Sequence, residues 1–438
     1  MERCGRRSGL EEREAWRGAG EDAKNILGLR NASPTRRGPA RRPMILFLHN
    51  RYRTTGGEER VVEDLAWLVR ERLGEPVELL SRDSVAVGRG RAAAGLLRGG
   101  LDAGEVAAAV RSTQARVVHA HNLQPTLGWR ALAAARAEGA RVVLHLHQYR
   151  LVCAVGVCFT RGAECTRCHG RNTLPGVLRD CRGNRAQALA YGAGLALWQR
   201  RIVEQADAVI VPSVFARERL RELGAPLPWE RVHVLAPPVR ALAAAATPVA
   251  GTRERESKST TVDERRSTSR GDPYALVVAR LSAEKGVDVA IDACRIAGVA
   301  LVVAGDGAER EVLARRAGEG GEVRFVGRVD AARLAELRVG AALALVPSRS
   351  AETFGLAAAE AMAAGLPVAA SQVGALPELV GEEGLVPAGD PSALARAIEC
   401  LREDAGAGAR ARARVRDICD PDVVAARLAA VYNGVASS

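Results

Sequence analysis

The chain has 438 residues and a formal net charge of +12. This length allows two domains with cores of their own, and a content of 47% hydrophobic and 26% charged residues is typical of a globular protein, not a disordered one. The sequence contains no apolar run of the roughly 20 residues that a membrane-spanning helix needs, so we predict no such span.

The amino-terminal segment, residues 1–43, is rich in Arg, Gly and Glu and shows little periodicity. It lacks the apolar stretch of a signal peptide, so we expect a disordered extension, followed by a folded region that begins at Met44. Because no secretion signal is visible, we expect the protein in the cytoplasm.

Positive charge is concentrated in the first half of the folded region. Residues 44–237 contain 27 Arg, no Lys and 18 acidic residues, whereas residues 238–438 contain 25 basic and 27 acidic residues. A basic first half can attract an anionic membrane surface or a diphospholipid at the inner face of the membrane; a solvated arginine-rich surface is an equal alternative. Nucleic acid is disfavoured as a partner because only 3% of the residues are aromatic.

Apolar runs alternate with helical patterns through both halves. In the first half the strand-like runs fall near residues 45–49, 77–80, 116–119, 141–146, 208–211 and 231–235. In the second half they fall near residues 275–279, 299–303, 322–326, 342–346 and 367–370. This alternation predicts parallel sheets, so the expected fold class is α/β, with two doubly wound, Rossmann-like domains that face a central cleft.

A glycine pair follows the first strand. Gly56 and Gly57 come directly before a helical pattern. Glycines let the backbone approach a ligand closely, and the free N–H groups at the start of a helix favour an anion. An ordinary turn between a strand and a helix is the alternative.

Two strands of the first half end in alternating histidines. His119 and His121 belong to one strand, and His145 and His147 belong to the next. Alternation places both rings of a pair on the same face of its strand. Such imidazoles can bind zinc, and they can also hydrogen-bond to sugar hydroxyls or share a proton.

Five of the nine cysteines lie in one short segment, loop 150–182. Two of them form a C-x-x-C pair, which can hold a tetrahedral metal together with two further thiolates. The preferred ligands of a structural zinc ion are Cys153, Cys165, Cys168 and Cys181. Cys158 is then a spare thiol or an alternative ligand. Free buried thiols, an iron–sulfur cluster and a disulfide are the alternatives, and a disulfide is disfavoured in a reducing cytosol.

A polar, low-complexity segment at residues 239–272 separates the first domain, residues 44–238, from the second domain, residues 273–420. A helix is expected after Asp420-Pro421, within residues 421–438. The triplet Asp420-Pro421-Asp422 stands at its start, where Asp is a natural helix cap, so we do not assign it to a catalytic metal.

The second domain carries the most informative motif, in three pieces that each follow an apolar strand. They are Arg280 with Lys285, then Gly305 with Asp306, and then Glu352 with Phe354, Gly355, Leu356 and Glu360. The carboxyl ends of parallel strands line the ligand crevice of such a sheet. Two cations, a glycine turn and a helix start suit a nucleoside diphosphate, and a carboxylate on that helix suits ribose hydroxyls. Solvated cations, an ordinary turn and a capping role for Glu352 are the alternatives.

With this motif the sequence resembles the family 4 retaining glycosyltransferases, which have the two-domain GT-B fold. The shared pattern is an Arg and a Lys five residues apart, followed by E-x-F-G-L with a second Glu eight residues after the first. The resemblance covers about residues 44 to 435. Loop 150–182 also resembles a subset of the family that has a cysteine-rich loop in the first domain.

The resemblance implies transfer of a sugar from a nucleoside diphosphate sugar to a glycan or lipid-linked acceptor with retention of configuration, in cell-surface polysaccharide or glycolipid biosynthesis. It implies no catalytic metal, and a last helix that crosses back to the first domain. The implied catalytic residues are His147, Arg280, Lys285 and Glu352. The implied donor-binding residues are Gly56, Gly57, Gly305, Asp306, Phe354, Gly355, Leu356 and Glu360. His121 and Asn122 are implied on the acceptor side.

Other functions stay open at this point. A sugar-nucleotide epimerase or a phosphorylase has the same fold, but a phosphorylase would need a lysine for pyridoxal phosphate, and the first domain has none. A non-enzymatic binding protein built around a zinc knuckle is the third possibility. Gln148 and His145 stand where the family often has Asp and Thr, so the acceptor side departs from the family pattern.

Overall fold

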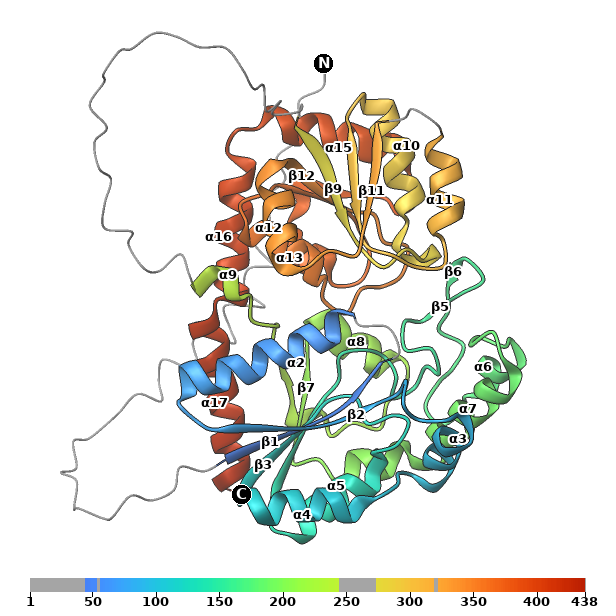
Figure 1. Cartoon of the computed structure of the whole chain (residues 1–438), viewed down its shortest axis with the longest axis vertical. Helices are drawn as coiled ribbons and strands as arrows, with labels where there is room; N and C mark the ends of the chain where they lie inside the picture. The colour runs from blue at the N-terminus through green and yellow to red at the C-terminus, as the bar shows by residue number, and fades with distance from the viewer. Residues whose placement is uncertain (1–43, 53–55, 244–272, 319–321, 438) are drawn as a thin grey trace, which may run out of the picture.

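The structure is a computed structural model that describes residues 44–52, 56–243, 273–318 and 322–437. The expected amino-terminal extension and most of the expected linker lie outside the described residues. Two α/β domains lie one above the other, and each is built on a six-stranded sheet (Figure 1). All strand pairs in both sheets are parallel, so the predicted fold class is confirmed.

The first sheet has the strand order β2-β1-β3-β4-β7-β8. Its strands are β1 (Met44–Arg51), β2 (Val77–Asp83), β3 (Ala115–Ala120), β4 (Arg141–His145), β7 (Ala208–Val211) and β8 (Val232–Val234). Central strands such as β1 are apolar on both faces because helices cover both sides of the sheet.

The second sheet has the order β11-β10-β9-β12-β13-β14. Its strands are β9 (Tyr274–Val278), β10 (Leu301–Ala304), β11 (Val323–Gly327), β12 (Ala341–Val346), β13 (Val368–Ser371) and β14 (Leu385–Val386). A short antiparallel pair, β5 (Phe159–Thr160) and β6 (Ala163–Glu164), stands outside both sheets. The sequence patterns did not predict β5, β6 or β14, because two residues are too few to display a period.

Helices connect the strands in both domains. Those of the first domain are α2 (Gly57–Leu68), α3 (Arg89–Arg98), α4 (Ala103–Thr113), α5 (Gly128–Ala137), α6 (Leu174–Leu178), α7 (Arg185–Glu204) and α8 (Val214–Glu222). Those that follow are α9 (Arg240–Ala243), α10 (Val287–Ala297), α11 (Arg310–Ala317), α12 (Ala331–Gly340), α13 (Leu356–Ala363), α14 (Leu376–Val380), α15 (Pro391–Glu403), α16 (Ala407–Cys419) and α17 (Pro421–Ser437). None of the helices in the described part of the chain combines the length and apolar character needed to cross a bilayer.

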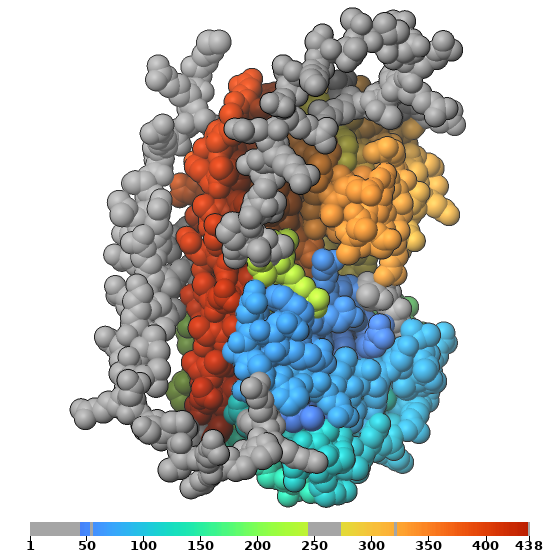
Figure 2. Space-filling model, turned by 60° about the vertical axis from the view of Figure 1, so that its left-hand side comes forward, coloured from blue at the N-terminus to red at the C-terminus, as the bar shows by residue number. Residues whose placement is uncertain are grey.

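The last helix belongs by its packing to the first domain. Helices α16 and α17 form a continuous band along one side of both domains (Figures 1 and 2). α16 packs on the second domain, whereas Val424, Leu428 and Tyr432 of α17 are buried in the same core as Ile45 and Phe47 of β1. The hydrophobic surface of α17 therefore ties the end of the chain to the first sheet.

Candidate active site

The two sheets each have one position at which the strand order reverses. In the first sheet it lies between β1 and β3, and in the second it lies between β9 and β12. In doubly wound sheets the crevice at the carboxyl ends of these strands binds ligands. The two crevices face each other, because the Thr353 hydroxyl, beyond β12, donates to the His147 carbonyl, beyond β4, at 2.8 Å.

Lys285 is held at the reversal point of the second sheet. Gly286 follows it with φ of 63°, and a Cβ at that position would lie 2.0 Å from the Pro347 carbonyl oxygen, so only glycine allows the two loops to approach this closely. Lys285 Nζ lies 2.6 Å from Glu352 Oε1, and the Ser348 hydroxyl donates to the same oxygen at 2.6 Å. The sequence analysis did not identify Ser348, because this residue follows β12 outside any recognisable motif.

Glu352 is charged in this arrangement. Burial acts to raise its pKa, but the ammonium group of Lys285 and the hydrogen bonds from Lys285 and Ser348 outweigh burial and lower the pKa below its usual value. The pair therefore fixes one cation and one anion at the crevice, with Lys285 keeping about a quarter of its side chain exposed.

The other predicted cation, Arg280, lies on the same loop but turns to the surface. Its guanidinium pairs with Glu284 at 2.6 Å, and its side chain is 50% exposed. Gly305 packs under this loop: its φ is 139°, and a Cβ there would lie 1.8 Å from the Ala279 carbonyl oxygen. Asp306 is exposed, and its carbonyl accepts the N–H of Leu281 at 3.0 Å. Gly305 and Asp306 thus support the Arg280 loop from the neighbouring strand.

The start of α13 meets the glycine pair of the first domain. Gly355, with φ of 101°, is the residue before the first turn of α13, and Phe354 is buried beside it. A Cβ on Gly57 would lie 3.5 Å from Leu356 Cδ2, so the glycine pair and the helix start are in contact across the domain boundary. Gly56 precedes α2, and its N–H donates to Glu59 at 2.8 Å. These five predicted donor residues come together.

Glu360 lies one turn further along α13 and bridges the two domains. It accepts an ion pair from Arg60 of α2 at 2.9 Å and another from Arg338 of α12. The side chain is almost buried. The sequence contained no signal for either arginine, since they are far from Glu360 along the chain.

Four histidines form what we call the histidine stack: His119, His121, His145 and His147. Hydrogen bonds join them in two pairs, with His119 Nε2 3.2 Å from His145 Nδ1 and His121 Nδ1 2.9 Å from His147 Nε2. The pairs lie on top of each other, with ring centroids 4.4 Å apart for His119 and His121 and 4.1 Å apart for His145 and His147. The hydroxyl of Tyr432 on α17 forms a hydrogen bond with His119 Nδ1 at 2.7 Å.

The histidine stack is uncharged near neutral pH. Burial lowers the pKa of His119 to about 3 and the pKa values of the other three far below the usual value, and the neighbouring imidazoles add to this effect. Only His147 keeps partial exposure, so it is the member that presents an imidazole to the cleft. His121 is buried behind it.

Asn122 is buried at the end of β3 and supports the first sheet. Its amide donates to the Asn50 carbonyl at 2.7 Å, and its carbonyl oxygen accepts the N–H of Gln124 at 3.2 Å. Both predicted acceptor-side residues, His121 and Asn122, thus lie beneath the cleft surface.

A carboxylate that sequence reasoning passed over contacts Gln148, the residue that follows His147. Glu58, directly after the glycine pair, accepts hydrogen bonds from the Tyr52 hydroxyl at 2.8 Å and from Gln148 Nε2 at 3.1 Å. Burial raises the pKa of Glu58, against the opposing effect of His49. Its place in the Gly-Gly-Glu sequence was the available signal, since a helix start favours an acidic residue.

The four predicted zinc ligands line one pocket of the first domain: Cys153, Cys165, Cys168 and Cys181. Cys158 lines it as well.

Comparison with known proteins identifies both domains. A model described as "Glycosyl transferase 4-like domain" matches residues 55–238, and a model described as "Glycosyl transferases group 1" matches residues 259–417. Together they cover the whole second sheet and every strand of the first sheet except β1, and they include Lys285 and Glu352.

Curated relatives agree with these models. The chain is 31% identical over 309 residues to a D-inositol 3-phosphate glycosyltransferase from Xylanimonas cellulosilytica, a match that covers 66% of this chain and 70% of the relative. It is 38% identical over 169 residues to a phosphatidyl-myo-inositol mannosyltransferase from Mycobacterium leprae, covering 35% of this chain. The chain spans only 44% of the length of that second relative.

Solved structures share the fold. A sucrose-phosphate synthase from Thermosynechococcus elongatus has a TM-score of 0.62 and 20% identity, covering 91% of this chain and all of the other. The Anabaena protein HepE, in complex with UDP and glucose, has a TM-score of 0.57 and 18% identity, covering 90% and 100%. The fold, the two domain models and the Xylanimonas relative agree: the chain belongs to the group 1 glycosyltransferases with a 4-like first domain.

Proposed function

We propose that the protein transfers a sugar from a nucleoside diphosphate sugar to a glycan or lipid-linked acceptor, with retention of configuration. The observation that carries the proposal is the Lys285–Glu352 pair at the reversal point of the second sheet, with Glu352 on the loop that leads into α13. This arrangement offers a fixed ammonium group and free backbone N–H groups to one anion. A diphosphate leaving group fits both.

The leaving diphosphate gains charge as the bond to the sugar breaks. Lys285 would stabilise that charge, and Glu352 with Ser348 would hold the ammonium group in place during the step. Arg280 would have to leave Glu284 in order to contribute, which its half-exposed position allows. In this proposal the protein's own cations do the work that a metal does in other transferases.

The sugar would lie against the first domain. His147 would contact it as a neutral imidazole, because the depressed pKa of His147 prevents it from carrying charge near neutral pH. Glu58, held by Tyr52 and Gln148, lies on the same side and would face the acceptor. We propose no covalent intermediate with a protein side chain; the departing phosphate would accept the proton of the acceptor hydroxyl.

The acceptor class rests on two further observations. Residues 44–237 carry an excess of nine positive charges, which suits an anionic lipid headgroup. Four of the relatives are named as mannosyltransferases of phosphatidylinositol species. We therefore propose action at the cytoplasmic face of a membrane, in polysaccharide or glycolipid assembly.

Two measurements test this function. A calorimetric panel of UDP, GDP and ADP against the full chain identifies the nucleotide. The enzyme is then given the α-linked sugar donor of that nucleotide, and NMR recorded before mutarotation shows the anomeric form of the sugar that the enzyme releases. The α anomer supports retention, the β anomer contradicts retention, and binding of no nucleotide contradicts the transferase proposal.

A further inference from the structure

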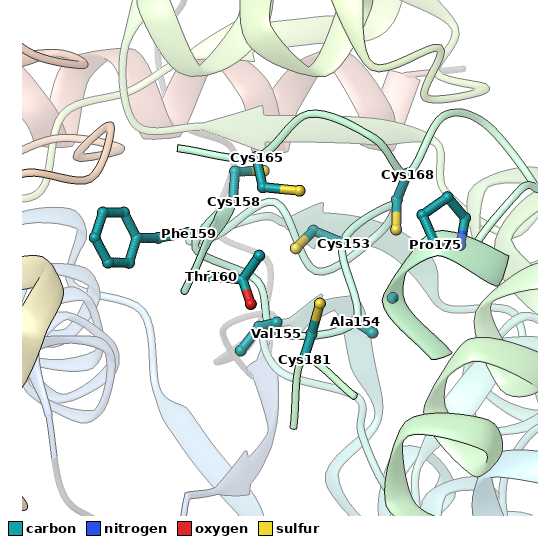
Figure 3. A pocket seen from close by; sticks show the side chains of 11 residues that line it. Cys153, Ala154, Val155, Cys158, Phe159, Thr160, Cys165, Cys168, Pro175 and Cys181 are labelled. Atoms are coloured by element: carbon teal, nitrogen blue, oxygen red, sulfur yellow. The ribbon is translucent and has the colours of Figure 1, made fainter. Parts of the chain in front are cut away.

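The first domain contains a pocket surrounded by thiols. It is a small pocket that is partly open to solvent. Figure 3 shows five cysteine side chains with their sulfur atoms directed toward this common space. They are Cys153, Cys158, Cys165, Cys168 and Cys181. We call this the cysteine pocket; none of its side chains takes part in the proposed transfer.

Tight turns bring the five thiols together. Across the β5–β6 pair, the N–H of Cys165 donates to the Cys158 carbonyl at 2.7 Å. The N–H of Cys181 donates to the Gly176 carbonyl at 3.1 Å, and a Cβ on Gly176 would lie 3.4 Å from the sulfur of Cys168. Cys158 has φ of 49°, a conformation that a residue with a side chain keeps only where its surroundings demand it.

The surrounding segment has little regular structure to hold it. Between β4 and α7, residues 146–184, the ordered elements are the two-residue strands β5 and β6 and the five-residue helix α6. Loops longer than about 15 residues with no secondary structure of their own are uncommon in compact domains. A metal bound by four thiolates fixes such segments in small metal-binding domains.

We propose that the cysteine pocket is a structural zinc site in which Cys153, Cys165, Cys168 and Cys181 are the ligands. Cys165 and Cys168 have the C-x-x-C spacing that grips one tetrahedral ion from a single turn. Cys158 is a hydrogen-bond neighbour of Cys153. Cys158 lines the same pocket and is the fifth thiol, left over when the other four bind the metal.

Zinc binding would bring the cysteine sulfurs of the pocket closer together. Among the described residues, only His119, His121 and His145 present three candidate ligand atoms within 4.8 Å of one another, so the cysteine sulfurs stand farther apart than in a closed site. Zinc–sulfur bonds of about 2.3 Å would place the sulfurs about 3.8 Å apart. Both ring nitrogens of His119 are engaged, by His145 at 3.2 Å and by the Tyr432 hydroxyl at 2.7 Å, so His119 is a poorer ligand than a thiol of the cysteine pocket.

The zinc site would stabilise the turn of the first domain that lies at one side of the cleft. The N–H of Cys153 donates to the Tyr149 carbonyl at 2.8 Å, and the Tyr149 hydroxyl lies 3.4 Å from the Ala351 carbonyl, one residue before Glu352. The same turn contains Gln148, which donates to Glu58. Metal at Cys153 would therefore fix the turn that carries both Tyr149 and Gln148.

Metal analysis of the full chain tests the proposal. We expect about one zinc per chain in the protein as purified. We expect Cys168→Ser and Cys181→Ser to lose it, whereas Cys158→Ser keeps it. Cys400→Ser is the matched control, since Cys400 is exposed on α15 in the second domain, and it should keep full zinc content.

A second measurement, on the wild-type chain, tests the proposal even if the variants fail to fold. Wild-type chain stripped of metal and titrated with Co²⁺ should develop the absorption of a tetrahedral tetrathiolate site, and Zn²⁺ should remove that absorption. Iron with sulfide in place of zinc, a disulfide found by mass spectrometry, or no response to Co²⁺ would each overturn the zinc site. Loss of zinc in Cys158→Ser would overturn the assignment of the four ligands.

Discussion

Protonation of the histidine stack predicts that the first domain loses stability in mild acid. His119, His121 and His145 are buried and uncharged in the folded protein, with pKa values far below the usual one. In the unfolded chain each would titrate near its usual pKa of about 6.5. The unfolded state therefore binds more protons below that pH, so stability is complete above about pH 6.5 and falls as the pH drops toward the folded pKa, about 3 for His119.

The size of the effect follows from linkage. Between pH 7.0 and pH 5.5, each of these histidines removes about 1.2 kcal/mol from the free energy of unfolding. The three together remove about 4 kcal/mol, a large share of the roughly 5–15 kcal/mol that holds a domain folded.

Urea unfolding followed by tryptophan fluorescence measures this loss. All four tryptophans in the described residues lie in the first domain: Trp67, Trp129, Trp198 and Trp229. Trp16, outside the described residues, is the fifth. The signal therefore reports the first domain rather than the second.

His145→Gln isolates the contribution of one histidine. It keeps a hydrogen-bonding group beside His119 but cannot titrate, so its loss of stability between pH 7.0 and pH 5.5 should be about 1.2 kcal/mol smaller than that of wild type. His233→Gln changes an exposed histidine on β8 and should leave most of the pH dependence in place. An unchanged pH dependence in His145→Gln would refute the account of a neutral, buried stack.

Two further predictions concern contacts that join distant parts of the chain. Tyr432→Phe leaves His119 Nδ1 without its partner and should lower the stability of the first domain by about 1–3 kcal/mol, measured by the same fluorescence; Tyr274→Phe removes a similar 2.8 Å hydrogen bond in the second domain and should not shift that transition. Glu378 accepts the N–H groups of Val214 and Phe215 at the start of α8, across the domain boundary. Glu378→Ala should therefore weaken the contact between the two domains by about 1–2 kcal/mol. The measurement is a larger radius of gyration in solution scattering; an unchanged radius would contradict this role.

Periodic sequence patterns were sufficient to predict the two sheets. The predicted strands at residues 116–119 and 208–211 match β3 and β7 to within one residue at each end, because buried parallel strands are continuous apolar runs bounded by polar turns. Patterns of this kind also place Lys285 and Glu352 at the same sheet edge, and the structure brings them to 2.6 Å.

The pairings between domains could not be predicted in the same way. Glu360 was a candidate for ribose hydroxyls, and its contacts with Arg60 and Arg338 depend on how α2 and α12 pack against α13. Tyr432 meets His119 across 313 positions of sequence. Such contacts are set by tertiary packing and leave no local period, and a single charged or aromatic residue on a helix does not indicate its partner.

The most direct test of the donor cradle is calorimetry of the bound nucleoside diphosphate with wild type, Lys285→Ala and Arg295→Ala. Arg295 is the matched control, because it is a cation of the same domain that pairs with Asp292 on α10, away from the crevice. The lost charged contact should weaken binding by about 1.5–3 kcal/mol in Lys285→Ala, roughly 10- to 150-fold in Kd, and Arg295→Ala should bind as wild type does. Equal binding by folded Lys285→Ala and wild type would contradict the proposal that this lysine holds the diphosphate.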